Sequence, residues 1–242
     1  MSAPGISRTI VRLGVLSVFG RWRGALLVVL PVVLLGLAVL VRVLVGEDAE
    51  VAENTLYAFA LAVVTPLVAL LATSGLLAPE IDDGSISYLL AKPVSRQTII
   101  ASKLAVAAAC VLVFAALPTL AAGLVLATSE PVLAGGFALG SMLGGLAYCS
   151  LFALLSVLTR HAVVVGLIYL LIWEGLLGGL LDGVRWLSIT RWSGEIVDAV
   201  ADVRLVEGVP VTYAVVATVV VVVAGGAMTG RQLRAFNLTG DE

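Results

Sequence analysis

Long, uninterrupted runs of apolar residues alternate with short polar segments along the chain. An α-helix needs about 20 apolar residues to cross the hydrocarbon core of a bilayer. Six runs have about that length: Gly24–Val45, Leu56–Leu77, Ile99–Ala127, Pro131–Leu158, Ala162–Leu180 and Tyr213–Met228. Because these runs are continuously apolar, and do not alternate between apolar and polar residues, they predict helices and not barrel strands. The pattern therefore predicts an all-α integral membrane protein with six transmembrane helices.

The charged residues separate into two sets, according to the ends of the predicted helices that they flank. With the N-terminus placed inside the cell, the inner segments hold ten of the 14 Lys and Arg residues: Arg8, Arg12, Arg21, Arg23, Lys92, Arg96, Lys103, Arg160, Arg231 and Arg234. The first outer loop is purely acidic, with Glu47, Asp48, Glu50 and Glu53. Because Lys and Arg collect in cytoplasmic loops, we expect cytoplasmic N- and C-termini.

The composition excludes a soluble domain. Hydrophobic residues make up 61% of the 242 residues and charged residues 12%, and the mean hydropathy is +1.14. A soluble domain has about 25% charged residues because its surface faces water, so much of this chain must face lipid. We therefore interpret residues 1–242 as a single transmembrane domain.

Three segments are predicted to lie outside the spans. Residues 1–23 mix apolar side chains with arginines and are typical of a helix in the inner interface, although they could also be a cytoplasmic extension of the first span. Residues 78–103 form an inner loop. Residues 181–211 form an outer loop with a possible amphipathic helix around 194–206, whose apolar face holds Ile196, Val197, Val200 and Val203.

Catalytic motifs are missing from the sequence. It contains no GxxxxGK[ST] loop for ATP and no HExxH helix for zinc. The single histidine, His161, follows Arg160 in a short inner turn and is interpreted as a solvated loop residue. We therefore expect no cofactor or metal in this chain, no catalysis by the chain itself and no nucleic-acid partner.

The inner loop has the pattern of a short helix between two spans. Asp83 and Gly84 predict a turn, and Ser85 is a suitable cap for a helix. Pro93 ends this helix, because the residue before a proline is pushed out of the α region. Ile86, Leu89 and Leu90 form its apolar face, and Glu80, Asp82, Asp83, Lys92 and Arg96 flank it. Such a helix fits a groove on another protein, or the segment is an ordinary interfacial loop.

In its order and spacing, this loop resembles the type-2, export-class permeases of ABC transporters. The residues that carry the resemblance are Glu80, Gly84-Ser85, Leu89-Leu90, Pro93-Val94-Ser95-Arg96 and Lys103. The six-span plan, the N-terminal segment and the outer segment before the last span extend it over nearly the whole chain. In that family the loop is the coupling helix that inserts into a separate nucleotide-binding subunit.

The resemblance implies the membrane-spanning permease subunit of an ATP-driven exporter in the cytoplasmic membrane. Its partners would be a P-loop ATPase, which binds ATP and Mg, and a second permease subunit. The residues expected to couple to the ATPase are Glu80, Asp83, Gly84, Ser85, Leu89, Leu90, Pro93 and Arg96. The alternative is a non-transport membrane protein, such as a sensor or assembly factor, that docks a soluble partner through residues 78–103. An intramembrane enzyme is a further alternative, disfavoured because the catalytic motifs are missing.

Two features lie within the spans. Glu174 lies in the middle of the fifth predicted span, where a carboxylate costs several kcal/mol unless it is partnered or protonated. It is either a cation- or substrate-binding group in the translocation path, or it makes a helix–helix hydrogen bond at the dimer interface or marks a span that ends earlier. The fourth span is rich in glycine, with the small-xxx-small spacing that lets another helix pack closely: Gly135, Gly136, Gly140, Gly144 and Gly145.

Overall fold

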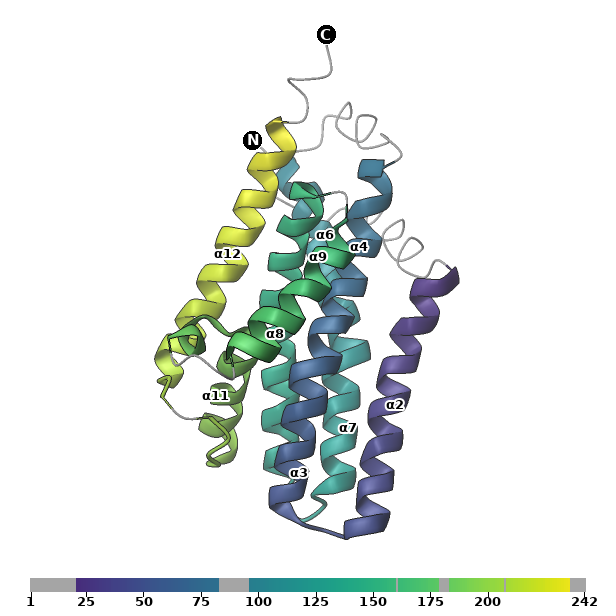
Figure 1. Cartoon of the computed structure of the whole chain (residues 1–242), viewed down its shortest axis with the longest axis vertical. Helices are drawn as coiled ribbons and strands as arrows, with labels where there is room; N and C mark the ends of the chain where they lie inside the picture. The colour runs from purple at the N-terminus through teal and green to yellow at the C-terminus, as the bar shows by residue number, and fades with distance from the viewer. Residues whose placement is uncertain (1–20, 83–95, 160, 179–182, 207, 236–242) are drawn as a thin grey trace.

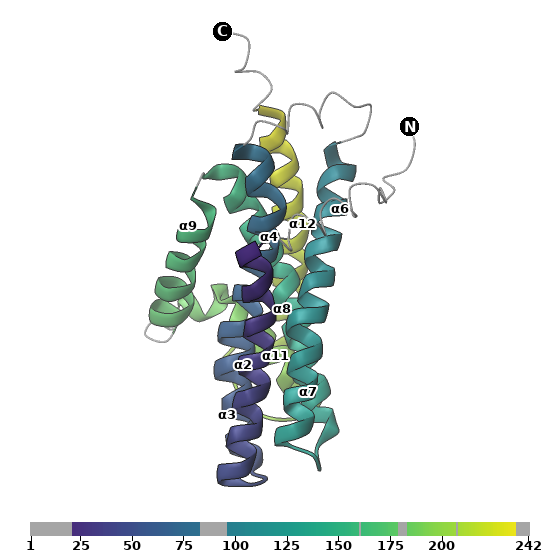
Figure 2. The ribbon, with the colours of Figure 1, turned by 90° about the vertical axis from the view of Figure 1, so that its right-hand side faces the viewer.

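The protein is a bundle of long helices that lie roughly along one axis (Figures 1 and 2). A computed structural model describes residues 21–82, 96–159, 161–178, 183–206 and 208–235, with side chains omitted at 21–23, 77–82, 96–99 and 233–235. Within those ranges every regular element is helical, which agrees with the all-α prediction.

The described helices include two continuous rods. α2 spans Arg21–Val45, and α3 (Ala49–Thr55), η1 (Leu56–Val64) and α4 (Thr65–Asp82) form one continuous rod. A second rod consists of α6 (Arg96–Val111), η2 (Leu112–Ala116) and α7 (Leu117–Leu126). The remaining elements are α8 (Pro131–Leu158), α9 (Ala162–Tyr169), η3 (Leu170–Leu177), η4 (Val184–Leu187), α11 (Ile189–Ala201) and α12 (Val211–Ala235).

Five helices in the described part of the chain are long and apolar enough to cross a membrane. They are Gly24–Val45, Ala49–Leu76, Ile100–Leu126, Pro131–Leu158 and Val211–Gln232. Each overlaps one of the predicted spans, and the fourth has the predicted bounds. The structure therefore supports five of the six predicted crossings.

The fifth predicted span, Ala162–Leu180, is described as far as Gly178. Its helix covers Ala162–Leu177 and, at 1.5 Å per residue, is about 24 Å long, against about 30 Å for the hydrocarbon core. Figure 2 shows α9 at one side of the bundle, ending well before the lower ends of α2 and α7. A complete sixth crossing is not confirmed, because the described part of this helix is too short to cross the hydrocarbon core.

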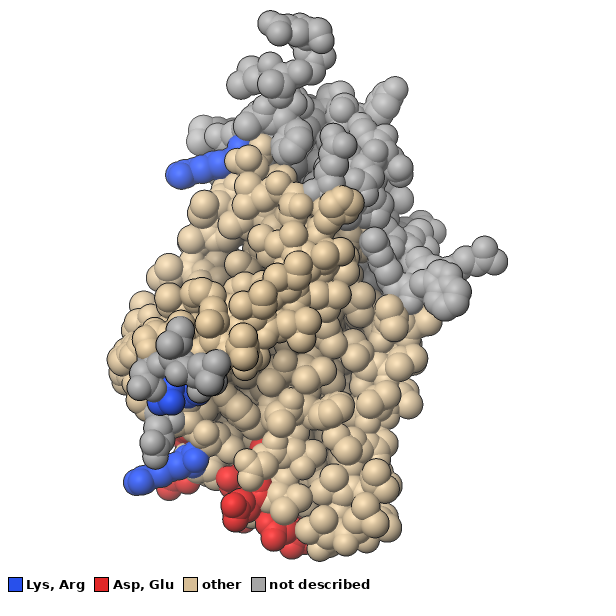
Figure 3. Space-filling model, viewed as in Figure 1, with Lys and Arg blue, Asp and Glu red and all other residues tan. Residues whose placement is uncertain are grey.

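The described helix ends lie at two opposite ends of the bundle. The C-terminal ends of α4 and α12 and the N-terminal end of α6 lie at the upper end of the bundle, and the α2–α3 connection lies at the lower end (Figure 1). Acidic side chains gather at the lower end of the face in Figure 3. The assignment of the upper end to the cytoplasm stays a prediction from the distribution of Lys and Arg.

α8 lies at the centre of the bundle, where it packs against α4, α6, α7, α11 and α12. Its glycines allow α11 to approach closely. A Cβ atom on Gly140 would lie 2.7 Å from the Ser193 carbonyl oxygen and 2.9 Å from a Val197 methyl group, and one on Gly144 would overlap the Ser193 hydroxyl. The predicted role of this glycine patch is therefore confirmed for Gly140 and Gly144, and their partner is α11.

The amphipathic helix expected around 194–206 is displaced toward the N-terminus and occupies Ile189–Ala201. Ser188 starts it, because its side chain accepts a hydrogen bond from the Arg191 backbone N–H. Asp202 ends it with a left-handed backbone (φ 54°). Ile196 and Val197 are buried, whereas Val200 is exposed. Val203 lies beyond the helix, so the predicted bounds were wrong.

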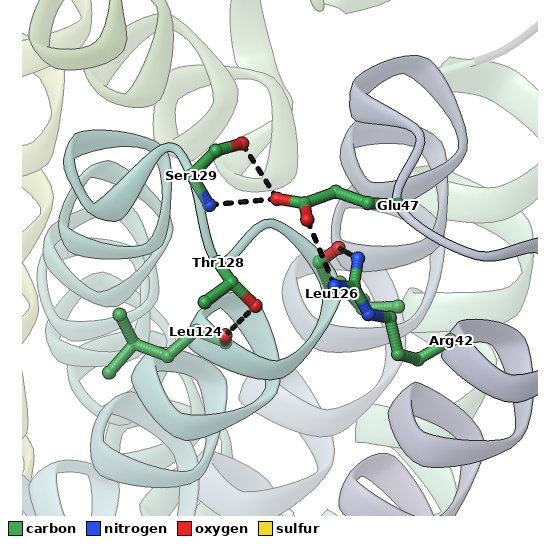
Figure 4. A network of polar contacts seen from close by, with 6 residues as sticks. All are labelled: Arg42, Glu47, Leu124, Leu126, Thr128 and Ser129. Carbon is green, nitrogen blue, oxygen red and sulfur yellow. Dashed lines mark hydrogen bonds and ion pairs between the residues drawn. The ribbon is translucent and has the colours of Figure 1, made fainter.

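A polar network fastens the lower end of α2 to the α7–α8 turn (Figure 4). Arg42 donates from Nη2 to Glu47 Oε2 at 2.9 Å and from Nη1 to the Leu126 carbonyl at 3.3 Å. Glu47 Oε1 accepts hydrogen bonds from the Ser129 N–H at 2.7 Å and from the Ser129 hydroxyl at 2.6 Å. The hydrogen bonds from Ser129, together with that from Arg42, lower the pKa of Glu47 to about 2.

Replacing Gly140 with Ala should destabilise the protein, because the new methyl group meets a backbone carbonyl of α11 that cannot simply rotate away. Overpacking of this kind costs about 1–3 kcal/mol, so we expect the Tm in detergent to fall by about 2–10 °C. Gly135→Ala is the matched control on the same helix, since nothing lies within 4 Å of its added Cβ. Equal Tm values for the two variants would contradict the close packing of α8 on α11.

The Glu47 network predicts a pH-dependent contribution to stability. A carboxyl group with a lowered pKa stabilises the folded state above its ordinary pKa of 4.5, and this contribution is lost as the pH falls toward about 2. Wild type should therefore have a higher Tm than Glu47→Gln at pH 6, and the difference should shrink between about pH 4.5 and 2. Glu50→Gln, at an exposed position in α3, is the control. A difference that does not change with pH would exclude the network as its source.

Candidate functional site

Most residues of the predicted coupling segment lie outside the described part of the chain: Asp83, Gly84, Ser85, Leu89, Leu90 and Pro93. The backbone of Glu80 belongs to α4 and that of Arg96 to α6. The ends of these two helices that flank the segment lie at the same end of the bundle (Figure 1). The predicted contacts of the segment with a partner therefore stay predictions.

Lys103 ties together the two helices that flank this segment. Its side chain is buried, with 4% exposed, and its Nζ donates a hydrogen bond of 2.8 Å to the Leu76 carbonyl near the end of α4. Burying an ammonium group among apolar neighbours is costly unless it is hydrogen-bonded. The sequence pattern included Lys103 but gave no role for it, and the structure shows that it joins α6 to α4.

A pocket of about 560 Å³ lies between the η1–α4 rod, the α9–η3 helix and the start of α11. One part of its wall is apolar and consists of Ala62, Val63, Leu67, Leu167, Leu170 and Leu171. The other part is polar and includes Tyr57, Glu174, Ser188, Thr190 and Arg191. The pocket has the volume of a drug-sized ligand site and contains the one intramembrane carboxylate that the sequence singled out.

Glu174 holds the N-terminus of α11. Its Oε2 accepts a hydrogen bond from the Ser188 hydroxyl at 2.5 Å, and its Oε1 accepts from the Ile189 backbone N–H at 2.9 Å and from the Tyr169 hydroxyl at 3.3 Å. A helix N-terminus presents unpaired N–H groups and a partial positive charge, and both favour a carboxylate. Within this chain Glu174 thus joins η3 to the start of α11. Its predicted roles in a substrate path or at a dimer interface stay predictions.

Arg191 and Thr190 attach the first turn of α11 to two other parts of the bundle. Arg191 Nη2 donates to the Gly178 carbonyl at 3.1 Å, at the end of η3. The Thr190 hydroxyl and the buried Tyr148 hydroxyl of α8 share a hydrogen bond of 2.8 Å. The polar wall of the pocket is therefore fixed from η3 on one side and from α8 on the other.

Two walls of the pocket are π-helical, η1 and η3. π-helical segments within α-helices occur frequently at functional sites. At the end of η1, the buried Thr65 hydroxyl donates to the Ala60 carbonyl at 2.8 Å and also contacts the Ser141 hydroxyl of α8 at 2.8 Å. These bonds satisfy polar groups in an apolar environment and hold the wall against the central helix.

Sequence reasoning found Glu174 but missed the rest of the polar wall. Tyr57 lies more than a hundred residues before Glu174, and Ser188 and Arg191 lie in the segment that was assigned to an outer loop. One local signal was available for Ser188, which precedes an amphipathic stretch as N-cap serines do. For Arg191 no sequence signal pointed to a pocket.

A family profile matches most of the sequence. The profile of the ABC-2 family transporter protein matches residues 38–232, which include the pocket, the loop between α4 and α6, and all of α8 and α11. The chain belongs to the ABC-2 transporter family. Proteins of this family are membrane components of ABC transporters and are not themselves catalytic. No curated protein matches the sequence.

Membership in the ABC-2 family fits the resemblance drawn from the loop and explains the apolar helices. It supports a multi-pass permease and implies an ABC ATPase partner in general terms. The intramembrane-enzyme alternative receives no support from it.

Glu174→Ala should loosen the first turn of α11. Loss of the acceptor leaves the Ile189 N–H and the Ser188 hydroxyl unpaired, so hydrogen–deuterium exchange across residues 189–192 should accelerate by roughly tenfold. Glu174→Gln keeps an acceptor oxygen and should show a smaller change. Tyr169→Phe, which leaves the carboxylate in place, is the control. Unchanged exchange in the Ala variant would mean that Glu174 does not hold this helix.

Proposed function

We propose that this ABC-2 family protein is the permease subunit of an ATP-driven exporter in the cytoplasmic membrane, with its ATPase on a separate chain. Two copies, or one copy and a homologue, would assemble with two P-loop ATPase subunits that bind ATP and Mg. The observation that carries the proposal is the match of the family profile over residues 38–232. The acidic, glycine-serine, leucine-pair and Pro-Val-Ser-Arg pattern of the loop, which lies within that match, is in line with it.

The helices that flank the loop offer a direct path for the force from ATP binding. The rod Ala49–Asp82 has the predicted coupling segment at one end and contributes Tyr57, Val63 and Leu67 to the pocket wall. Packed helices transmit displacements as rigid bodies because protein interiors are close-packed. Lys103 binds this rod to α6, so that both helices beside the loop would move together.

The pocket is the proposed part of the substrate path in this chain. It lies between the second and fifth apolar segments of the sequence, and its rim faces outward, with Leu171 72% exposed. In a bilayer this rim would meet lipid or the second subunit. A substrate could thus enter the pocket from the lipid or from the second subunit. Glu174 would contribute by holding the start of α11, which forms part of the pocket wall.

Charge reversal in the coupling segment should uncouple ATP hydrolysis from transport. We expect Arg96→Glu combined with Leu89→Asp to abolish transport while the ATPase subunit keeps its basal hydrolysis, because an apolar contact and a charge pair at the docking surface are lost together. The measurement is ATPase activity and efflux in proteoliposomes that contain both subunits.

Arg231→Glu is the matched control, since Arg231 is an exposed arginine near the end of α12, at the same end of the bundle. This variant should transport like the wild type. Normal transport by the Arg96/Leu89 double variant would remove the docking proposal. Co-assembly with a soluble partner that hydrolyses nothing would instead favour the sensor or assembly-factor alternative.

A further inference from the structure

The two charged side chains of the pocket do not have equal freedom to bind a ligand. The carboxylate of Glu174 already accepts hydrogen bonds from Ser188, Ile189 and Tyr169. Three donors and a helix N-terminus satisfy most of its acceptor capacity and disperse its charge. Glu174 is therefore poorly placed to recognise a cationic group, which was one reading of this residue from the sequence.

Arg191 is in the opposite situation. A guanidinium group has five N–H donors, and the Gly178 carbonyl takes one of them, from Nη2. The remaining donors belong to a side chain that lines the pocket. Among the described residues, the one salt bridge joins Arg42 to Glu47. Arg191 therefore forms no ion pair with a described carboxylate, and the forked geometry of its guanidinium suits a phosphate or carboxylate group.

The rest of the pocket is suited to a chain of apolar groups. Leu67, Leu167 and Leu170 line it beside the polar end. The apolar side extends to the outer surface, where Leu171 is 72% exposed. Where that surface meets the hydrocarbon of a bilayer, an acyl or other apolar tail could lie along it without entering water.

We propose that the pocket binds an anionic amphiphile, whose phosphate or carboxylate head pairs with Arg191 and whose apolar tail lies against Leu67, Leu167 and Leu171. The proposal rests on the proposed function, in which this pocket belongs to the substrate path, and it names the substrate class. It assigns opposite roles to the two charges: Arg191 contacts the ligand, and Glu174 positions the helix that carries Arg191.

The test is direct binding by the full-length protein in a neutral maltoside detergent, measured by isothermal titration calorimetry. The probes are dodecyl phosphate, dodecyltrimethylammonium and inorganic phosphate. Dodecyl phosphate should bind at least about tenfold more tightly than either of the others. Equal binding of the cationic amphiphile would overturn the assignment of charge. Binding of inorganic phosphate as strong as that of dodecyl phosphate would mean a site for free anions, without a role for the apolar wall.

Arg191→Gln should weaken binding of dodecyl phosphate by about tenfold, since one charge-assisted pair is lost. The matched control is Arg204→Gln, an exposed arginine that follows α11 and does not line the pocket. It should bind like the wild type. Unchanged affinity in Arg191→Gln, or an equal loss in Arg204→Gln, would overturn the proposal.

Leu171→Asp keeps the test decisive if Arg191→Gln fails to fold, because its side chain is largely exposed and contributes little to the core. This variant should weaken the binding of dodecyl phosphate and leave the binding of inorganic phosphate unchanged. An unaltered affinity for dodecyl phosphate would overturn the proposed site for the apolar tail. The binding assay needs no ATPase. If the protein assembles with an ATPase but does not prefer the anionic amphiphile, only the ligand proposal is overturned. If it binds the anionic amphiphile selectively but has no ATPase partner, only the proposed exporter function is overturned.

Discussion

The contact between the Glu174 carboxylate and the N-terminus of α11 is the interaction on which the rest of the site depends. In an apolar environment a helix end leaves unpaired N–H groups that water cannot satisfy. Glu174 supplies the acceptor from η3. The cost of a carboxylate inside the bundle and the cost of a bare helix end therefore offset each other, and α11 is fixed beside η3.

The glycines of α8 fix the other side of α11. Gly140 and Gly144 bring the two helices so close that backbone and small side chains make the contact, and Tyr148 adds a hydrogen bond to Thr190. With α11 held between α8 and η3, Arg191 faces the pocket rather than solvent. Residues of α8 and η3 thus position α11, and Arg191 on α11 is the residue that would bind the ligand. The rod Ala49–Asp82 forms one pocket wall and ends at the predicted coupling segment. In our proposal it therefore links the pocket to the ATPase subunit.

The sequence was sufficient to predict features that depend on local composition. Continuous apolar runs located five spans, and the glycine spacing of the fourth predicted its close packing. It was insufficient where tertiary contacts decide the outcome. The amphipathic pattern placed α11 five residues too late, because the Ser188 cap was not recognised. The partners of Glu174 could not be predicted, since they become neighbours only after α11 folds back on η3.

The central claim is that this chain works as a permease with an ATPase on another chain. The most direct measurement is to isolate the tagged full-length protein from its native membranes in mild detergent and identify what co-purifies. We expect a P-loop ATPase of roughly 25–35 kDa, an ordinary size for one or two domains, to co-purify in a one-to-one ratio with this protein. Isolation of the protein alone, or with a partner that lacks a P-loop, while its native neighbours are expressed, would contradict the claim.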